Sequence, residues 1–103
     1  MPTALVTGAS DGIGKEFCNV LAERGYSLIL VARRKKRLED LANRLIKGFG
    51  INCSTISHDL AKPEAARELY DSVSEMGLSV DFLVNNAGLL QNGFFKDLSL
   101  IHI

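Results

Sequence analysis

The sequence predicts an α/β fold, a doubly wound sheet of parallel strands with helices on both faces. Short apolar segments alternate with longer segments of helical periodicity, and this alternation is typical of right-handed crossovers between parallel strands. Ser27–Val31 is apolar without interruption after its first residue, as expected of a central strand that is covered on both faces. A glycine-rich turn at residues 7–14 joins the first apolar segment to the first helical one, and the other elements are arranged around it.

Each element follows from a local pattern. We expect strands at residues 3–7, 27–31, 51–57 and 80–84, and helices at residues 12–24, 35–47 and 63–76. Gly25 and Gly48 are expected to end the first two helices, and Pro63 to begin the third. The sheet is therefore predicted to have four strands.

The first helix has an apolar stripe that predicts its buried face. Ile13, Phe17, Val20 and Leu21 follow the spacing i, i+4, i+7 and i+8, which aligns side chains along one side of a helix. We expect this stripe to pack against the sheet.

Composition excludes several classes of protein. With 103 residues the chain is long enough for one small domain, and its formal net charge of 0 gives no general attraction to nucleic acid or anionic membranes. No apolar run approaches the roughly 18 residues of a membrane span, and no signal peptide is evident, so we expect a cytoplasmic protein. Cys18 and Cys53 lie far apart without metal-ligand spacing, so we expect reduced thiols and no metal site.

The glycine-rich turn predicts a pyrophosphate site. It follows a buried strand and opens a helix, whose first N–H groups have no partner within the helix and whose dipole favours an anion. Glycine lets the backbone approach a phosphate closely. The spacing Gly-x-x-x-Gly-x-Gly differs from the common Gly-x-Gly-x-x-Gly fingerprint, and a purely structural turn is the alternative.

Three motifs together resemble a known family. Thr7–Gly14, Asp59-Leu60 and Asn85–Gly88 have the order and separation of the signatures of short-chain dehydrogenases/reductases, so the resemblance covers the chain to about Gly88. It implies a Rossmann fold with strand order 3-2-1-4 that is truncated after about four strands, which leaves the fourth strand at an edge. It also implies an oxidoreductase that transfers hydride between a nicotinamide cofactor and a small carbonyl or alcohol substrate.

The resemblance assigns cofactor contacts to three groups of residues. The glycine turn would line the phosphates, Asp59 and Leu60 would contact the adenine, and the segment after the fourth strand would border the riboses. The arginines after the second strand complete the set. The expected cofactor-binding residues are Gly8, Ser10, Gly12, Ile13, Gly14, Arg33, Arg34, Asp59, Leu60, Asn85, Ala87 and Gly88.

The end of the second strand favours NADP(H) over NAD(H). NAD-selective sites place Asp or Glu there to bind the ribose hydroxyls, whereas this chain has Ala32 followed by Arg33 and Arg34. A guanidinium can pair with a 2′-phosphate in a bidentate, charge-assisted way. We expect Arg33 to be the main contact and Arg34 a second one. The alternative is that the basic run Arg33–Arg37 is only a solvated helix start.

Catalytic residues of the family are not found in this chain. Its members use a Tyr-x-x-x-Lys pair and a serine, but neither Tyr26 nor Tyr70 has a lysine four residues on. We therefore expect an inactive cofactor-binding fragment of an enzyme that, when full length, forms homo-oligomers. A non-catalytic NADP(H)-binding regulator is the alternative function, and a genuine short polypeptide without activity is a further one.

The last six residues predict a boundary. Residues 98–103 can be encoded by bases identical to the end of a widely used transposase sequencing adaptor, so we expect a partial native domain at residues 1–97 and a non-native tail. The alternative is that Leu98-Ser99 begins the next helix.

Overall fold

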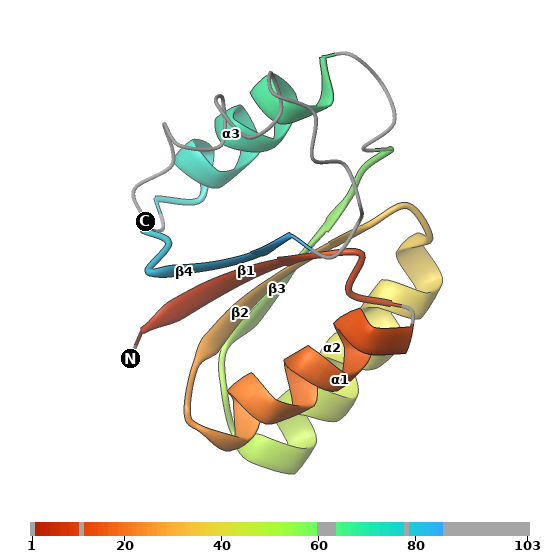
Figure 1. Cartoon of the computed structure of the whole chain (residues 1–103), viewed down its shortest axis with the longest axis vertical. Coiled ribbons are helices and arrows are strands. Elements are labelled where there is room, and N and C mark those ends of the chain that lie inside the picture. The colour runs from red at the N-terminus through yellow and green to blue at the C-terminus, as the bar shows by residue number, and fades with distance from the viewer. Residues whose placement is uncertain (1, 11, 60–63, 78, 86–103) are drawn as a thin grey trace.

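A computed structural model describes residues 2–10, 12–59, 64–77 and 79–85 (Figure 1). Strands and helices alternate throughout, as the sequence predicts. In chain order the elements are β1 (Thr3–Thr7), α1 (Gly12–Glu23), β2 (Ser27–Ala32), α2 (Lys35–Phe49), β3 (Cys53–Ser57), α3 (Ala65–Glu75) and β4 (Phe82–Asn85). The proposed tail at residues 98–103 lies outside the described residues.

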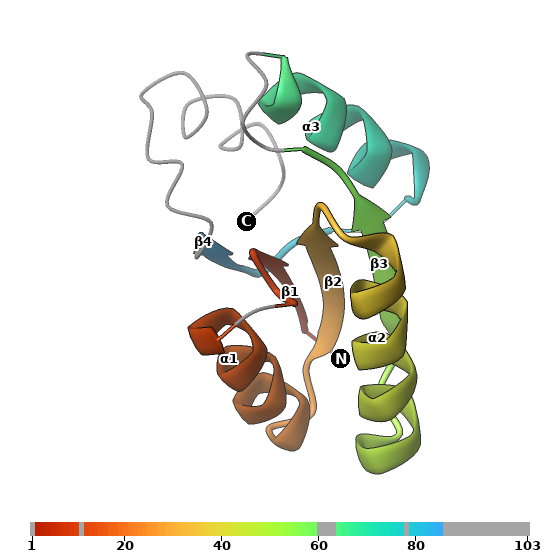
Figure 2. The same cartoon turned by 90° about the vertical axis from the view of Figure 1, so that its right-hand side faces the viewer.

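The four strands form one parallel sheet in the order β3-β2-β1-β4. Helices α1 and α2 cover one face and α3 covers the other (Figures 1 and 2). The doubly wound fold and the strand order expected from the family resemblance are therefore confirmed. Among the described residues, β4 pairs only with β1, so it forms one edge of the sheet.

Two apolar layers pack on the two faces of the sheet. Because side chains alternate along a strand, β2 contributes Leu28 and Leu30 to the layer under α1 and α2, and Ile29 and Val31 to the layer under α3. All four are essentially inaccessible to solvent. This is the physical reason for the uninterrupted apolar run that predicted a central strand.

The predicted buried face of α1 is wrong. Ile13, Phe17 and Val20 are 68%, 44% and 46% exposed, whereas the helix buries Gly14, Cys18, Leu21 and Ala22. The two stripes share Leu21 and are otherwise offset by one residue, about 100° around the helix. The stripe of mostly small residues faces the sheet, and such residues let a helix axis approach closely. The larger apolar side chains face away.

Helix ends depend on glycines with positive φ. Gly25 (φ 86°) ends α1 in a Schellman motif, with its N–H bonded to the Ala22 carbonyl and the next N–H to the Leu21 carbonyl, both at 3.0 Å. Helix α2 continues through the predicted stop at Gly48 and ends at Gly50, which has φ 68°. Gly48 keeps a helical conformation because the chain can make its left-handed turn two residues later.

Other boundaries shift by a few residues. Strand β3 begins at Cys53 rather than at residue 51, β4 begins at Phe82 rather than at residue 80, and Pro63 lies outside the described residues. None of the described helices combines the length and the apolar character that crossing a membrane requires.

Candidate functional site

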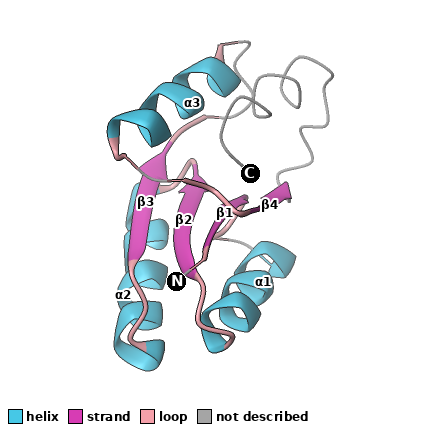
Figure 3. Cartoon of the chain, turned by 90° about the vertical axis from the view of Figure 1, so that its left-hand side faces the viewer, coloured by secondary structure: helices cyan, strands magenta, loops and turns pink. Residues whose placement is uncertain are grey.

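The carboxyl ends of all four strands meet at one edge of the sheet. Thr7 is in register with Val31 of β2 and with Asn85 of β4, and Ala32 is in register with Ser57 of β3. All four arrows run in the same sense in Figure 3. The chain leaves β1 for β2 on one side and returns to β4 on the other, which is the switch point where open α/β sheets bind ligands.

The glycine turn occupies this switch point directly after β1. Gly8 and Gly12 have φ values of 65° and 44°, which are accessible to glycine at little cost. The Ala9 N–H donates to the Val31 carbonyl at 3.3 Å, which fixes the turn against β2. A Cβ added to Gly12 would meet no atom within 4 Å, so the turn is open at this residue.

This geometry fits a diphosphate. The N–H groups in the first turn of α1 have no acceptor within the helix, and the positive end of the helix dipole lies at the same place. Gly14 is buried against the sheet, whereas Gly12 and Ile13 are exposed and Ser10 is half-buried. The turn therefore presents backbone donors on an accessible surface while its base is held by packing.

Thr7 links the turn to β4. It is the fully buried polar residue of the described core, and its Oγ1 donates to the Val84 carbonyl at 3.4 Å. The contact joins β1 to β4 at the edge where the candidate site lies.

The arginines after β2 are exposed and their backbone is anchored. Ser57 Oγ donates to the Arg33 carbonyl at 3.1 Å, and the His58 N–H donates to the Ala32 carbonyl at 2.9 Å. Arg34 occupies the N-cap position of α2 without a side-chain capping bond. Neither guanidinium forms an ion pair with a carboxylate in the described part of the chain. Both positive charges are thus exposed at the edge of the sheet where the strands end.

The segment after β3 brings one basic and one acidic residue, His58 and Asp59, to this edge. Asp59 is half-buried, in the position expected after β3. His58 Nε2 lies 3.8 Å from Glu68 Oε1 of α3, and it is buried without a hydrogen-bond partner among the described residues. Glu68 is brought to His58 by the packing of α3, which no local pattern in the sequence predicts.

Some predicted site residues cannot be placed. Leu60, Ala87 and Gly88 lie outside the described residues. Asn85 is the last residue of β4, in register with Thr7, so its backbone reaches the same edge.

The cysteines lie apart from this edge and are free thiols, as expected. Burial raises the pKa of Cys18 to about 12, with a further contribution from the charge of Cys53. Burial also raises the pKa of Cys53 to about 11. Both groups are therefore protonated near neutral pH, and a protonated thiol is a poor nucleophile. Within the described ranges, no three His, Cys, Asp or Glu residues are grouped as a metal site would require.

The family model described as "short chain dehydrogenase" matches residues 2–103. Among curated proteins, a very-long-chain 3-oxoacyl-CoA reductase of Phaeosphaeria nodorum is 43% identical over 90 residues, which cover 84% of this chain and 26% of that protein. The 11-beta-hydroxysteroid dehydrogenase 1A of Arabidopsis thaliana is 39% identical over 94 residues, covering 91% and 27%. The chain thus spans about a quarter of the length of these relatives.

Solved structures agree with this match. A short-chain dehydrogenase from Sphingobium yanoikuyae in complex with NADPH has a TM-score of 0.77 and 40% identity, covering 88% of this chain and 35% of that one. L-sorbose reductase from Gluconobacter frateurii, complexed with NADPH and L-sorbose, has a TM-score of 0.79 and 37% identity, covering 84% and 33%.

Proposed function

This chain belongs to the short-chain dehydrogenase/reductase family, and on that premise we propose that it is the NADP(H)-binding part of a longer oxidoreductase. The reaction would interconvert a small-molecule carbonyl and its alcohol. Two NADPH complexes among the similar structures support the choice of cofactor. The observation that carries the proposal is the glycine turn, open at Gly12, beside exposed Arg33 at one edge of the sheet.

The glycine turn would hold the cofactor diphosphate. Backbone N–H groups from Gly12 to Gly14, at the start of α1, would donate to phosphate oxygens, and Gly8 and Gly12 would keep the backbone close to them. Ser10 would add a hydroxyl on the same side. Ile13 would contribute only its N–H group. Its side chain is exposed to solvent rather than packed on the sheet.

Arg33 would select the phosphorylated cofactor. A carboxylate at the end of β2 would repel a 2′-phosphate, and this chain has Ala32 there instead. The Ser57–Arg33 hydrogen bond restrains the backbone from which the guanidinium extends, so less freedom is lost when a phosphate binds. Arg34 would provide a second positive charge, and Asp59 would accept from the adenine amino group.

The bound nicotinamide supplies the hydride, and this chain supplies orientation and electrostatics. The proton-transferring tyrosine and lysine of the family would come from sequence beyond the fold described here. We propose Leu60, Asn85, Ala87 and Gly88 as the remaining cofactor contacts. The full-length protein is proposed to be cytoplasmic and homo-oligomeric.

Calorimetric titration with NADPH and NADH tests the choice of cofactor. We expect Arg33→Ala to weaken NADPH binding by about 10- to 100-fold, the range for losing a charged hydrogen bond, and to leave NADH binding unchanged. Lys47→Ala removes an exposed cation from the far end of α2 and serves as the control. Equal weakening of NADPH and NADH by Arg33→Ala would contradict the selectivity.

Recovery of the downstream coding sequence tests the rest. We expect the locus to diverge from residues 98–103 after Asp97 and to encode a serine and a Tyr-x-x-x-Lys motif. A longer gene without that motif would contradict the oxidoreductase, and genomic reads that continue through residues 98–103 would contradict the boundary.

A further inference from the structure

The end of β3 holds two consecutive carbonyls of the link between β2 and α2. The His58 N–H donates to the Ala32 carbonyl at 2.9 Å, which continues the pairing of β2 with β3. The Ser57 hydroxyl donates to the next carbonyl, that of Arg33, at 3.1 Å. The first bond comes from the backbone and is independent of any side chain, whereas the second depends on the serine hydroxyl.

The side chain of Ser57 lies on the face of the sheet that α2 covers. Side chains alternate along a strand, and in β3 Cys53 packs in the layer under α1 and α2, whereas Ile56 packs in the layer under α3. Ser57 therefore faces the same side as Cys53. The chain turns to this side as it leaves β2 for α2 (Figure 2), so the serine hydroxyl meets the Arg33 carbonyl there.

These bonds restrict the direction in which the Arg33 side chain leaves the backbone. Peptide groups are planar, so the peptide groups before and after a residue together determine the direction of its Cα–Cβ bond. The His58 N–H holds the peptide group before Arg33, and the Ser57 hydroxyl holds the one after it. Arg34, the N-cap residue of α2, makes no side-chain capping bond, so the start of the helix adds no such restraint of its own.

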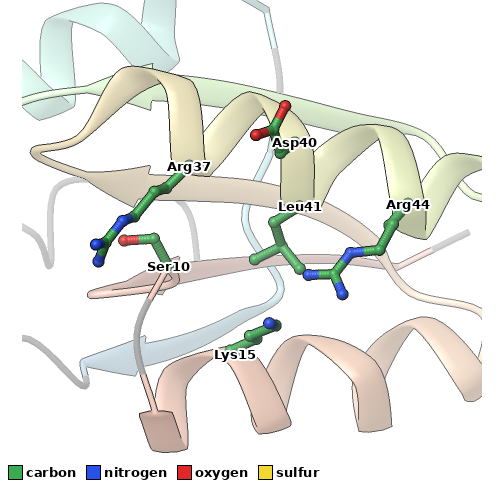
Figure 4. A pocket seen from close by; sticks show the side chains of 6 residues that line it. All are labelled: Ser10, Lys15, Arg37, Asp40, Leu41 and Arg44. Carbon is green, nitrogen blue, oxygen red and sulfur yellow. The ribbon is translucent and has the colours of Figure 1, made fainter.

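The start of α2 borders the glycine turn. A groove lies between α1 and α2, and it is lined by Ser10 of the turn and by Arg37 of α2, which extends toward Ser10 (Figure 4). Arg33 lies in the link that leads into α2. The proposed diphosphate site and the link that carries Arg33 are therefore neighbours at one edge of the sheet.

We propose that Ser57 is a positioning residue that strengthens the preference for the 2′-phosphorylated cofactor. Its hydroxyl restrains Arg33 before the cofactor binds, so less conformational freedom is lost when the guanidinium pairs with the 2′-phosphate. Ser57 touches neither the cofactor nor the reacting atoms, and its effect passes through Arg33. This inference rests on the proposed function and adds to it a residue of β3 that tunes the choice of cofactor.

Calorimetric titration with NADPH and NADH tests the proposal through a double-mutant cycle. We expect Ser57→Ala to weaken NADPH binding by about two- to tenfold, the range for ordering one long side chain, and to leave NADH binding unchanged. In the Arg33→Ala background, Ser57→Ala should cause no further loss. Ser54→Ala removes a hydroxyl from the other face of β3 and is the matched control.

A second pair of variants separates the hydroxyl from the packing of the side chain. Ser57→Thr keeps the hydroxyl and should bind NADPH like the wild type. Ser57→Val has a similar shape without the hydroxyl and should behave like Ser57→Ala, and both β-branched residues suit a strand. NADPH binding that Ser57→Ala leaves unchanged, equal weakening of NADPH and NADH, or a loss that persists without Arg33 overturns the proposal while the proposed function stands. A wild type that binds neither dinucleotide overturns both.

Discussion

Asp81 and Thr3 are joined by two reciprocal hydrogen bonds. The Thr3 N–H donates to Asp81 Oδ2 at 2.8 Å, and the Asp81 N–H donates to the Thr3 carbonyl at 2.8 Å. Asp81 precedes β4 and Thr3 begins β1, so the pair fixes the register of the two strands at their amino ends. That register brings Asn85 opposite Thr7 at the other end, where the candidate site lies.

Removing the Asp81 carboxylate should loosen β4. We expect Asp81→Ala to lower the free energy of unfolding by about 1 kcal/mol, since the bond is charge-assisted but exposed to solvent. Asp81→Asn keeps an acceptor and should cost less. Urea denaturation measures both, with Asp71→Ala on the exposed surface of α3 as the control. A loss for Asp71→Ala as large as that for Asp81→Ala would argue against the pairing.

Neighbouring residues of α1 should respond differently to truncation. Leu21 is 8% exposed and Val20 is 46% exposed. We expect Leu21→Ala to cost about 2–4 kcal/mol through lost burial and a cavity, and Val20→Ala less than about 1 kcal/mol. Urea midpoints of the two variants compare them directly. A larger loss at Val20 would mean that the predicted stripe, rather than the observed one, faces the sheet.

Substitution of two glycines by alanine should change the stability of the chain in opposite directions. Gly48 is inside α2 without positive φ, and Gly12 has φ 44°; an added Cβ meets no atom within 4 Å at either residue. We expect Gly48→Ala to stabilise the chain by about 0.5–1 kcal/mol through helix propensity. Gly12→Ala should destabilise it by about 1 kcal/mol, because only the backbone conformation is strained. Thermal denaturation followed by circular dichroism decides, and a shift of the same sign for both would contradict the assigned conformations.

Stability should fall at alkaline pH because of Cys18. Burial raises the pKa of its thiol from 9.0 to about 12, so the folded chain keeps this proton at pH values where the unfolded chain releases it. The resulting stability is fully present below pH 9 and is lost as the pH rises towards 12. We expect the urea midpoint of the wild type to fall more steeply above about pH 9 than that of Cys18→Ala. Parallel pH profiles would show that Cys18 is not the source.

Local patterns were sufficient for most of the fold. The uninterrupted run of β2 predicted a strand with helices on both faces, and Leu28 and Ile29 do pack into opposite layers. The Gly25 stop was correct because a Schellman motif involves only the last turn of a helix. The Gly48 stop was wrong because Gly50 provides an equivalent turn two residues later, and sequence alone does not rank the two.

The sequence also predicted that Gly8, Arg33 and Asp59 follow the first three strands, and the structure has them just after β1, β2 and β3 at one edge of the sheet. Their contacts with a cofactor stay a prediction. Tertiary structure decided what depends on contacts between distant elements. It chose which stripe of α1 meets the sheet, because close packing favours the small side chains of Gly14 and Cys18 over the large ones of Ile13 and Phe17. It also placed Lys15 of α1 and Arg44 of α2 along the same groove. This arrangement follows from the packing of the two helices, and no local pattern contains it.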